Sequence, residues 1–343
     1  MIRELIEKPH LILSYLFAFY LLLGIWSRIP LETGLLFVSI SMILFFLMIF
    51  WIGFLFGSRT GLKKRKVDIG QSFSTIILVL GAIGIISSYL VIGSPTIWVR
   101  ERNPVWTLSY ILFSVGVVSL SKDFRKFIIL SVLTMMVCLP SGYRIDFLFP
   151  ILGSYFRLHF SEREESFWPS FFLILVLVTS LTYKVLSSYI SEGCLYPLGY
   201  LVTGRAGFTL YSLQRIIEVE INEKKLAFGM YHGKLFLNSY FLDLVIGERE
   251  LIGPSIGEVT LGWPKSYTST MIGPILLDLG IVGLVSFSFI MGFLSFVFLR
   301  WCPTCYSMYL ASLVLWVESG PAHVYLVGSL VLSVLMRWYF GKE

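Results

Sequence analysis

Long apolar segments recur along the whole chain and leave few positions for charged residues. The 343 residues are 56% hydrophobic and only 14% charged, with a mean hydropathy of +0.81. A soluble globular domain carries about 25% charged residues. Many of the apolar runs approach the ~20 residues that cross the ~30 Å hydrocarbon core of a bilayer. The sequence therefore predicts an all-α polytopic membrane protein.

The apolar runs predict about ten transmembrane helices, each long enough to be weighed as a bilayer crossing. They are expected over residues 10–26, 34–57, 72–93, 105–120, 127–139, 147–158, 167–189, 270–299, 304–317 and 324–339. The first run follows a short charged start without a small-residue cleavage site, so we expect a retained helix. The run 147–158 is short, and losing it as a crossing would invert the topology of everything after it.

The distribution of basic residues predicts the orientation. With the N-terminus inside, the short inner segments hold fifteen lysines and arginines and the short outer loops hold four. Cytoplasmic loops carry such an excess, so both termini are predicted inside a cell membrane. The chain then divides into N-terminal transmembrane helices (1–189), a large external loop (190–269) and C-terminal transmembrane helices (270–343). The formal charge of +6 reflects this topology, and we expect no nucleic-acid partner.

The external segment 190–269 mixes charged, aromatic, glycine and proline residues, unlike the rest of the chain. Between residues 204 and 221, apolar side chains recur at helical spacing: Leu210, Leu213, Ile217 and Ile221. This stripe predicts a helix. A second apolar helix is expected over 234–246, and the glycines and prolines of 247–264 predict a loop.

Three arginines of the outer side are candidate anion-binding residues. Arg144 lies at the outer edge of two apolar runs, and Arg205 and Arg215 lie in the predicted helix 204–221. A guanidinium grips phosphate with paired hydrogen bonds. Arg205 and Arg215 are about 80° apart around a helix, so both are expected to face one cavity. The alternatives are a structural pair of Arg144 with Asp146, and of Arg215 with Glu218.

Two further residues are candidates for proton transfer. His232 suits a general base near neutral pH, although a lone histidine in a loop is more often a hydrogen-bonded structural residue. Asp278 lies in a predicted membrane entry, where an ionisable group faces a cavity or a partner; an anchor between helices is the stronger interpretation. Tyr143 and Trp263 are candidates for stacking on sugar rings, although such residues also gather at membrane interfaces.

Known motifs for other chemistries are missing from the sequence. It contains no phosphate-binding glycine loop, no HExxH, no GxSxG and no acidic metal cluster. We therefore expect no metal and no cofactor.

Four segments between residues 141 and 283 carry a family resemblance, which covers the distal half of the chain best. They are SGYRIDFLFP (141–150), GRAGF (204–208), HGKLFLNSYFLDLVI (232–246) and TSTMIGPILLDLGIVG (268–283). Their order and spacing resemble those of the Wzy-type O-antigen polymerases, the oligosaccharide repeat-unit polymerases. The first hundred residues match in hydropathy only, and the Pro-Arg that such polymerases often show after the third segment is replaced here by Gly247-Glu248-Arg249.

The resemblance implies a GT-C-like fold of the O-antigen polymerase-ligase type, with a large, partly helical external loop. It implies a metal-independent membrane glycosyltransferase that polymerises oligosaccharide repeat units carried on polyprenyl (undecaprenyl or dolichyl) diphosphate. On this basis the expected catalytic residues are His232, Arg205 and Asp278. The expected substrate-binding residues are Arg144, Arg205, Arg215, Tyr143 and Trp263. Membrane lipids, a flippase and a chain-length regulator are the expected partners.

Two other functions compete with the polymerase. An O-antigen ligase-like enzyme would transfer the finished glycan to a different acceptor. A flippase or transporter of the lipid-linked oligosaccharide should scatter polar groups along many helices and show internal repeats. Here the polar residues concentrate in one outer segment and no repeat is visible, which favours the enzyme.

Overall fold

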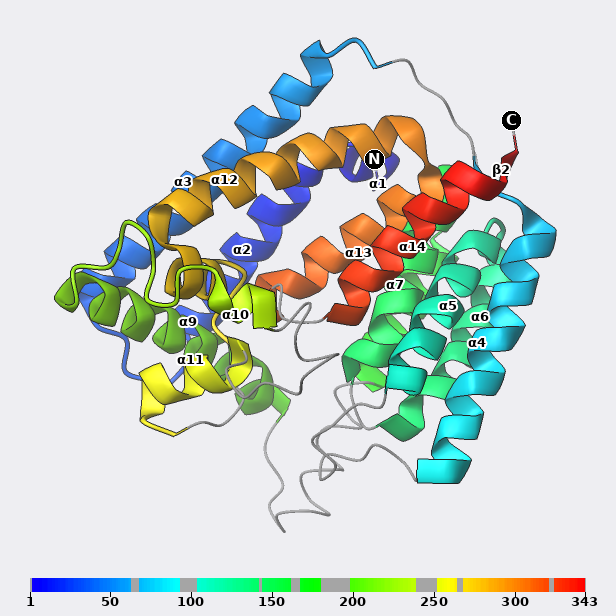
Figure 1. Cartoon of the computed structure of the whole chain (residues 1–343). Coiled ribbons are helices and arrows are strands. Elements are labelled where there is room, and N and C mark those ends of the chain that lie inside the picture. The colour runs from blue at the N-terminus through cyan, green and yellow to red at the C-terminus, as the bar shows by residue number, and fades with distance from the viewer. Residues whose placement is uncertain are drawn as a thin grey trace.

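The computed structural model describes residues 2–62, 68–92, 104–141, 144–161, 167–179, 198–238, 252–263, 268–320 and 324–342. These residues are helical almost throughout (Figure 1). The helices are α1 (Ile2–Ile6), α2 (Pro9–Ile25), α3 (Thr33–Arg59), α4 (Gln71–Ile92), α5 (Pro104–Leu120), α6 (Phe124–Cys138), the 3-10 turn η1 (Leu139–Ser141), α7 (Arg144–Ser161), α9 (Leu198–Asn222), α10 (Lys234–Leu237), α11 (Ile252–Leu261), α12 (Ile272–Trp301), α13 (Pro303–Ser319) and α14 (Val324–Phe340). A further apolar helix covers Trp168–Thr179. Strands β1 (Asp68–Ile69) and β2 (Gly341–Lys342) form a short antiparallel pair that the all-α prediction missed.

Each predicted span falls on one of these helices, although the end of the span 167–189 lies outside the described residues. Among the described residues, four helices are long and apolar enough to cross a membrane: Thr33–Arg59, Gln71–Val91, Phe124–Ser141 and Ile272–Trp301. Shorter apolar helices accompany them, among them Pro9–Ile25, Pro104–Leu120 and Leu326–Tyr339. The helices therefore have the character of a multi-pass membrane protein. The number of crossings and their orientation stay predictions.

Helices α3 and α12 lie side by side over most of their length (Figure 1). Glycines permit this approach, because a Cβ atom at Gly53 would collide with the backbone of Phe289 and one at Gly292 with the backbone of Phe50. Close packing through small residues is how helices associate in lipid, where apolar burial gives no driving force. Apolar side chains on the outer face of α3 stay exposed, such as Phe37 at 69%, as expected of a surface that contacts lipid tails.

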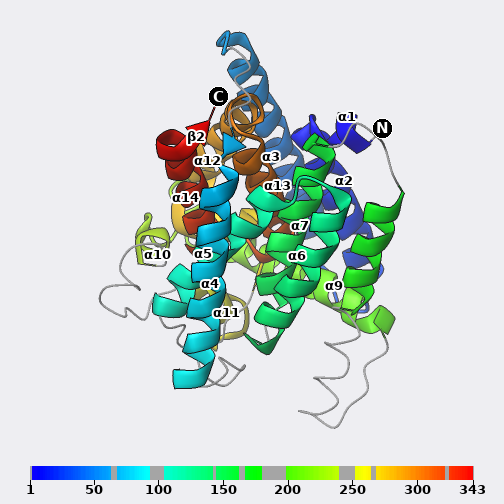
Figure 2. The same cartoon turned by 90° about the vertical axis from the view of Figure 1, so that its right-hand side faces the viewer.

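Helix α7 packs against three other helices, α5, α6 and α13 (Figure 2). Thirteen of its side chains between Asp146 and His159 are buried. This helix contains the run 147–158, whose short length made the crossing doubtful. Its burial explains the polar residues: a helix surrounded by protein does not need a continuous apolar surface towards lipid.

The two chain termini lie at the same end of the molecule (Figures 1 and 2). There Asp68 pairs through its backbone with Lys342. Its carboxylate forms ion pairs with Arg157 and, at 3.4 Å, with Lys122, and accepts a hydrogen bond of 2.6 Å from the Thr304 hydroxyl. Burial alone would raise the pKa of Asp68, but Arg157, Thr304 and Lys122 outweigh it and hold that pKa below its ordinary value. This network joins the ends of α7 and α13 to the C-terminus.

In the predicted external segment, α9 confirms the helix expected over 204–221. The expected second helix begins as α10 at Lys234, and residues 239–246 lie outside the described part. The prediction of a loop over 247–264 is wrong for Ile252–Leu261, which forms α11. Pro254 lies in the first helical turn, where proline is tolerated, and Ile252 and Ile256 are buried one turn apart. Packing of α11 on α9 and α12 outweighs its glycine content.

Candidate functional site

Five polar residues from distant parts of the sequence come together at the end of the molecule that contains Arg144 of α7 and Arg205 of α9. We call Tyr20, Arg144, Arg205, Thr268 and Glu318 the arginine cluster. Arg205 donates through Nε to Glu318 Oε1 at 2.9 Å and through Nη2 to Thr268 Oγ1 at 3.2 Å. Arg144, at the start of α7, interacts electrostatically with Glu318, Arg205 and Tyr20. Two of the three predicted arginines therefore meet in one place.

The arginine cluster carries an excess of positive charge. Arg205 and Glu318 form an ion pair, with 44% and 41% of their side chains exposed. Among the ion pairs found between described residues, none involves Arg144. Glu318 balances only one of the two positive charges, and like charges held close together in a partly buried site repel each other unless a further anion joins them. The arrangement is therefore suited to an anionic ligand.

Close contact between α2 and α9 places Arg205. A Cβ atom at Gly207 would collide with the Ser27 side chain, so only glycine allows this approach. The Tyr20 hydroxyl donates to Thr209 Oγ1 at 3.2 Å, and Thr209 in turn donates to the carbonyl of Arg205 at 2.9 Å. In the segment GRAGF, the second glycine, Gly207, thus packs against the end of α2, and the arginine, Arg205, belongs to the arginine cluster.

The contact between the end of α13 and the start of α12 places Glu318 and Thr268. Gly320 ends α13 with φ of 68°. A Cβ atom there would lie 2.7 Å from Pro274 Cγ and 3.0 Å from the carbonyl oxygen of Thr270. Glycine is needed both for this left-handed backbone and for the close contact. These contacts fix the end of α13 against the start of α12. Glu318 and Thr268 therefore both reach the guanidinium of Arg205.

The structure does not bring the third arginine into this group. Arg215 forms its ion pair with Glu218, three residues further along α9. It lies ten residues after Arg205, which corresponds to about 15 Å along a helix axis. The similar angular positions of Arg205 and Arg215 therefore do not make them neighbours. A role for Arg215 in substrate binding stays a prediction.

Asp278 caps a second helix from within α12. Its carboxylate accepts backbone N–H bonds from Gly233 at 2.9 Å, Leu235 at 3.2 Å and Phe236 at 2.8 Å. These groups form the N-terminal turn of α10, where the helix dipole favours an anion. Two residues later α12 is broken at Gly280, with φ of 64° and ψ of −159°. The contacts of Asp278 are those of a structural anchor, as the stronger sequence interpretation expected.

The segment that contains His232 fills this break in α12. The Leu277 carbonyl accepts a bond from the Met230 N–H, and the Leu226 carbonyl accepts one from the Ile281 N–H, both at 2.8 Å. Irregular backbone inside a membrane protein persists only when its polar groups are satisfied in this way. His232 is exposed and lies near Asp278. No contact among the described residues joins His232 to the arginine cluster, and the catalytic roles of His232 and Asp278 stay predictions.

A role of the two aromatic candidates in stacking on sugar rings stays a prediction. Tyr143 lies outside the described residues. Trp263 follows α11 with 72% of its surface exposed. Sequence reasoning missed Tyr20 and assigned no role to Glu318. Neither had a local signal, because a tyrosine near the end of an apolar run is typical of any membrane interface.

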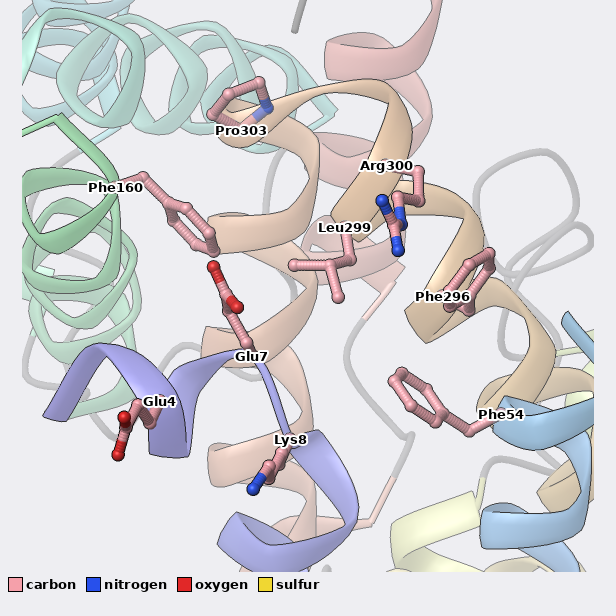
Figure 3. A pocket seen from close by; sticks show the side chains of 9 residues that line it. All are labelled: Glu4, Glu7, Lys8, Phe54, Phe160, Phe296, Leu299, Arg300 and Pro303. Atoms are coloured by element: carbon pink, nitrogen blue, oxygen red, sulfur yellow. The ribbon is translucent and has the colours of Figure 1, made fainter. Parts of the chain in front are cut away.

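A cavity of about 510 Å³ lies at the opposite end of α7 and α13 (Figure 3). Its lining includes Phe160 at the end of α7 and Pro303 at the start of α13. Pro303 and Glu318 are fifteen residues apart, about 22 Å along a helix. The cavity carries two acidic and two basic side chains: Glu4, Glu7, Lys8 and Arg300. With no excess of positive charge, it does not select an anion as the arginine cluster does.

Comparisons with known proteins identify the family. Residues 6–328 match the family described as "Putative O-antigen polymerase". The chain is also 24% identical over 354 residues to an uncharacterized protein of Methanocaldococcus jannaschii, covering 92% of this chain and 88% of that relative. No solved structure matches the chain significantly. Because the family match extends over most of the chain and includes every residue of the arginine cluster, this protein belongs to the O-antigen polymerase family.

Proposed function

We propose that the protein is a membrane glycosyltransferase that polymerises oligosaccharide repeat units linked to a polyprenyl diphosphate, and that Arg144 and Arg205 bind the diphosphate. The family supplies the class of reaction. The observation that carries the assignment of the site is the ion pair of Arg205 with Glu318, with Arg144 close enough to interact electrostatically with both. The excess positive charge matches the most strongly charged part of such a substrate.

The chemistry of the reaction explains why arginines suit this place. In the transfer the bond between the anomeric carbon and the diphosphate breaks, and negative charge develops on the leaving diphosphate. Fixed cations lower the barrier by stabilising that charge. Arginine offers planar, paired donors that match phosphate oxygens. Transfer without a metal ion is part of the proposal, because two guanidinium groups already supply the positive charge.

The position at the end of the helices suits a lipid-linked substrate. Arg144 begins the buried helix α7, and Arg205 lies on α9, which packs against the apolar helix α2. A polyprenyl chain in the bilayer then lies beside the apolar helices while its diphosphate reaches the arginines. We place this end on the outer side of the cell membrane, as the distribution of basic residues predicts.

The test is an incubation of the purified protein in detergent with its native lipid diphosphate-linked repeat unit, without nucleotide, in the presence and absence of EDTA. Products are resolved on a gel. A ladder of glycan lengths in both arms supports a metal-independent polymerase. A ladder that EDTA abolishes keeps the polymerase and removes the metal-independent mechanism.

Other products would replace the proposed function. Transfer of the glycan once to a different acceptor identifies a ligase. If no glycosidic bond forms, the protein is placed in sealed vesicles with the same lipid. Movement of the lipid-linked unit across those vesicles then identifies a flippase and refutes the enzyme.

A further inference from the structure

Glu318 is the carboxylate of the arginine cluster, and the packing of its helix holds it in place. It belongs to the last turn of α13, and the contact of Gly320 with Pro274 fixes that turn against α12. Its side chain is 41% exposed, so it reaches solvent on one side and the arginines on the other. Its electrostatic partners are Arg144, Arg205 and Tyr20. Glu318 is therefore the carboxylate at the centre of the arginine cluster.

A diphosphate bound to the arginines would change the surroundings of this carboxylate. Arg205 now uses its Nε–H for Glu318 and an Nη2–H for Thr268. A diphosphate oxygen would compete for the same donors. The diphosphate bears more charge than a carboxylate and binds guanidinium with paired bonds. An ion pair as exposed as that of Arg205 and Glu318 contributes little, so the exchange of partners is easy and leaves Glu318 with a free oxygen.

We propose that Glu318 occupies Arg205 in the empty site and, once the diphosphate has displaced it, accepts the proton of the acceptor hydroxyl. This inference rests on the proposed function and adds the acceptor side of the reaction. The acceptor oxygen forms a bond to the anomeric carbon of the donor glycan. The bond from that carbon to the diphosphate oxygen breaks, and the lipid diphosphate leaves with the electron pair. The hydroxyl proton passes to the Glu318 carboxylate and from there to water.

The geometry favours Glu318 over His232 as the base. A general base must lie within hydrogen-bonding reach of the proton that it removes, in the substrate complex. Glu318 is 2.9 Å from an arginine that is expected to hold the leaving group, so it lies beside the reacting bond. His232 lies near Asp278, at the break in α12, and no described contact places it beside either arginine.

The test compares Glu318→Gln with Glu218→Gln, because the chain offers a matched pair. Glu218 forms a similarly exposed ion pair with Arg215, and both residues lie on α9, as Arg205 does. The Glu218 side chain is 34% exposed and that of Glu318 is 41% exposed. Two quantities are measured: the affinity for undecaprenyl diphosphate alone, and the rate of transfer from the native lipid-linked repeat unit as a function of pH.

For Glu318→Gln we expect undecaprenyl diphosphate to bind at least as tightly as to the wild type, because a competing anion is gone. We expect kcat to fall by about 10²–10⁴-fold, the usual contribution of a general base. The acid limb of the pH–rate profile should disappear, and Glu318→Asp should recover part of the rate. Glu218→Gln and the wild type should agree in both measurements.

Three results would overturn the proposal. A kcat within threefold of the wild type in Glu318→Gln shows that the carboxylate accepts no proton. A loss of undecaprenyl diphosphate binding shows that Glu318 only supports the arginines. An acid limb that disappears in His232→Gln and persists in Glu318→Gln makes the histidine the base. Failure of the proposed function is a separate result, since then the wild-type protein itself forms no glycosidic bond.

Discussion

Replacing Arg205 by alanine should lower the rate of transfer strongly and change the stability of the fold very little. The ion pair with Glu318 is almost half exposed on both sides, with 44% and 41% of the side chains accessible. Exposed pairs contribute about 0.2–1 kcal/mol to stability. The apparent midpoint of thermal unfolding in detergent should therefore shift by only a few degrees.

The effect on transfer should be much larger. Hydrogen bonds to charged groups contribute about 1.5–3 kcal/mol each, and Arg205 has two N–H groups that now bind Glu318 and Thr268. If both turn to the diphosphate, their loss costs about 3–6 kcal/mol, or about 10²–10⁴-fold in kcat/KM. Arg144→Ala should lose transfer to a similar extent. Arg144→Lys should recover little, because an ammonium keeps the charge without the paired planar donors.

The assay is the rate of transfer from the native lipid-linked repeat unit, with thermal unfolding followed on the same preparations. Lys126→Ala serves as a control, because Lys126 forms a surface pair of 2.9 Å with Asp123 at the start of α6, outside the arginine cluster. Arg215→Ala measures whether the third predicted arginine takes part. Transfer within threefold of the wild type in Arg205→Ala or Arg144→Ala would remove that arginine from the mechanism. A fall in unfolding temperature as large as that of a core variant would mean that the lost activity reports misfolding.

Three further variants test the local structure. Burial raises the pKa of Glu220 from its ordinary value of 4.5 to about 7. Between these two values the folded protein holds a proton that the unfolded chain releases. The free energy of unfolding should therefore fall by about 2–3 kcal/mol as the pH rises from about 4 to 8. Glu220→Gln should remove this slope in thermal unfolding; an unchanged slope contradicts the shift. Gly207→Ala should separate α2 from α9, because its Cβ would collide with Ser27, and lower transfer together with unfolding temperature, whereas a neutral result would mean that the helices move apart freely. Asp278→Ala leaves three N–H groups at the start of α10 without their acceptor and should lower the free energy of unfolding by about 2–4 kcal/mol. Asp278→Asn should recover part of this stability. A strong loss of transfer in Asp278→Asn at unchanged stability would instead support a catalytic role.

Hydropathy located the long apolar helices, because lipid imposes its demand on each segment separately. A run such as 34–57 must be apolar and helical whatever its neighbours are, and the structure has α3 at that place. The stripe that begins at Leu210 predicted α9 for a similar local reason. The order of motifs also led to the family, which the match over residues 6–328 confirms.

Packing decided what these local rules do not cover. Glycine and proline in Ile252–Leu261 indicated a loop, but contact with α9 and α12 makes it the helix α11. The short length of 147–158 cast doubt on a crossing, and the structure has a buried helix there, packed between α5, α6 and α13. In both cases the energy comes from neighbours that are distant in the sequence.

The candidate site shows the same division. The sequence by itself pointed to Arg144 and Arg205, since an arginine at the edge of apolar runs has few reasons to be there. Only the tertiary structure joined Arg205 to Glu318, 113 residues away, and separated it from Arg215, ten residues away on the same helix. Side-chain chemistry is local and can be read from sequence, whereas the partners of a charge depend on how α2, α7, α9 and α13 pack together.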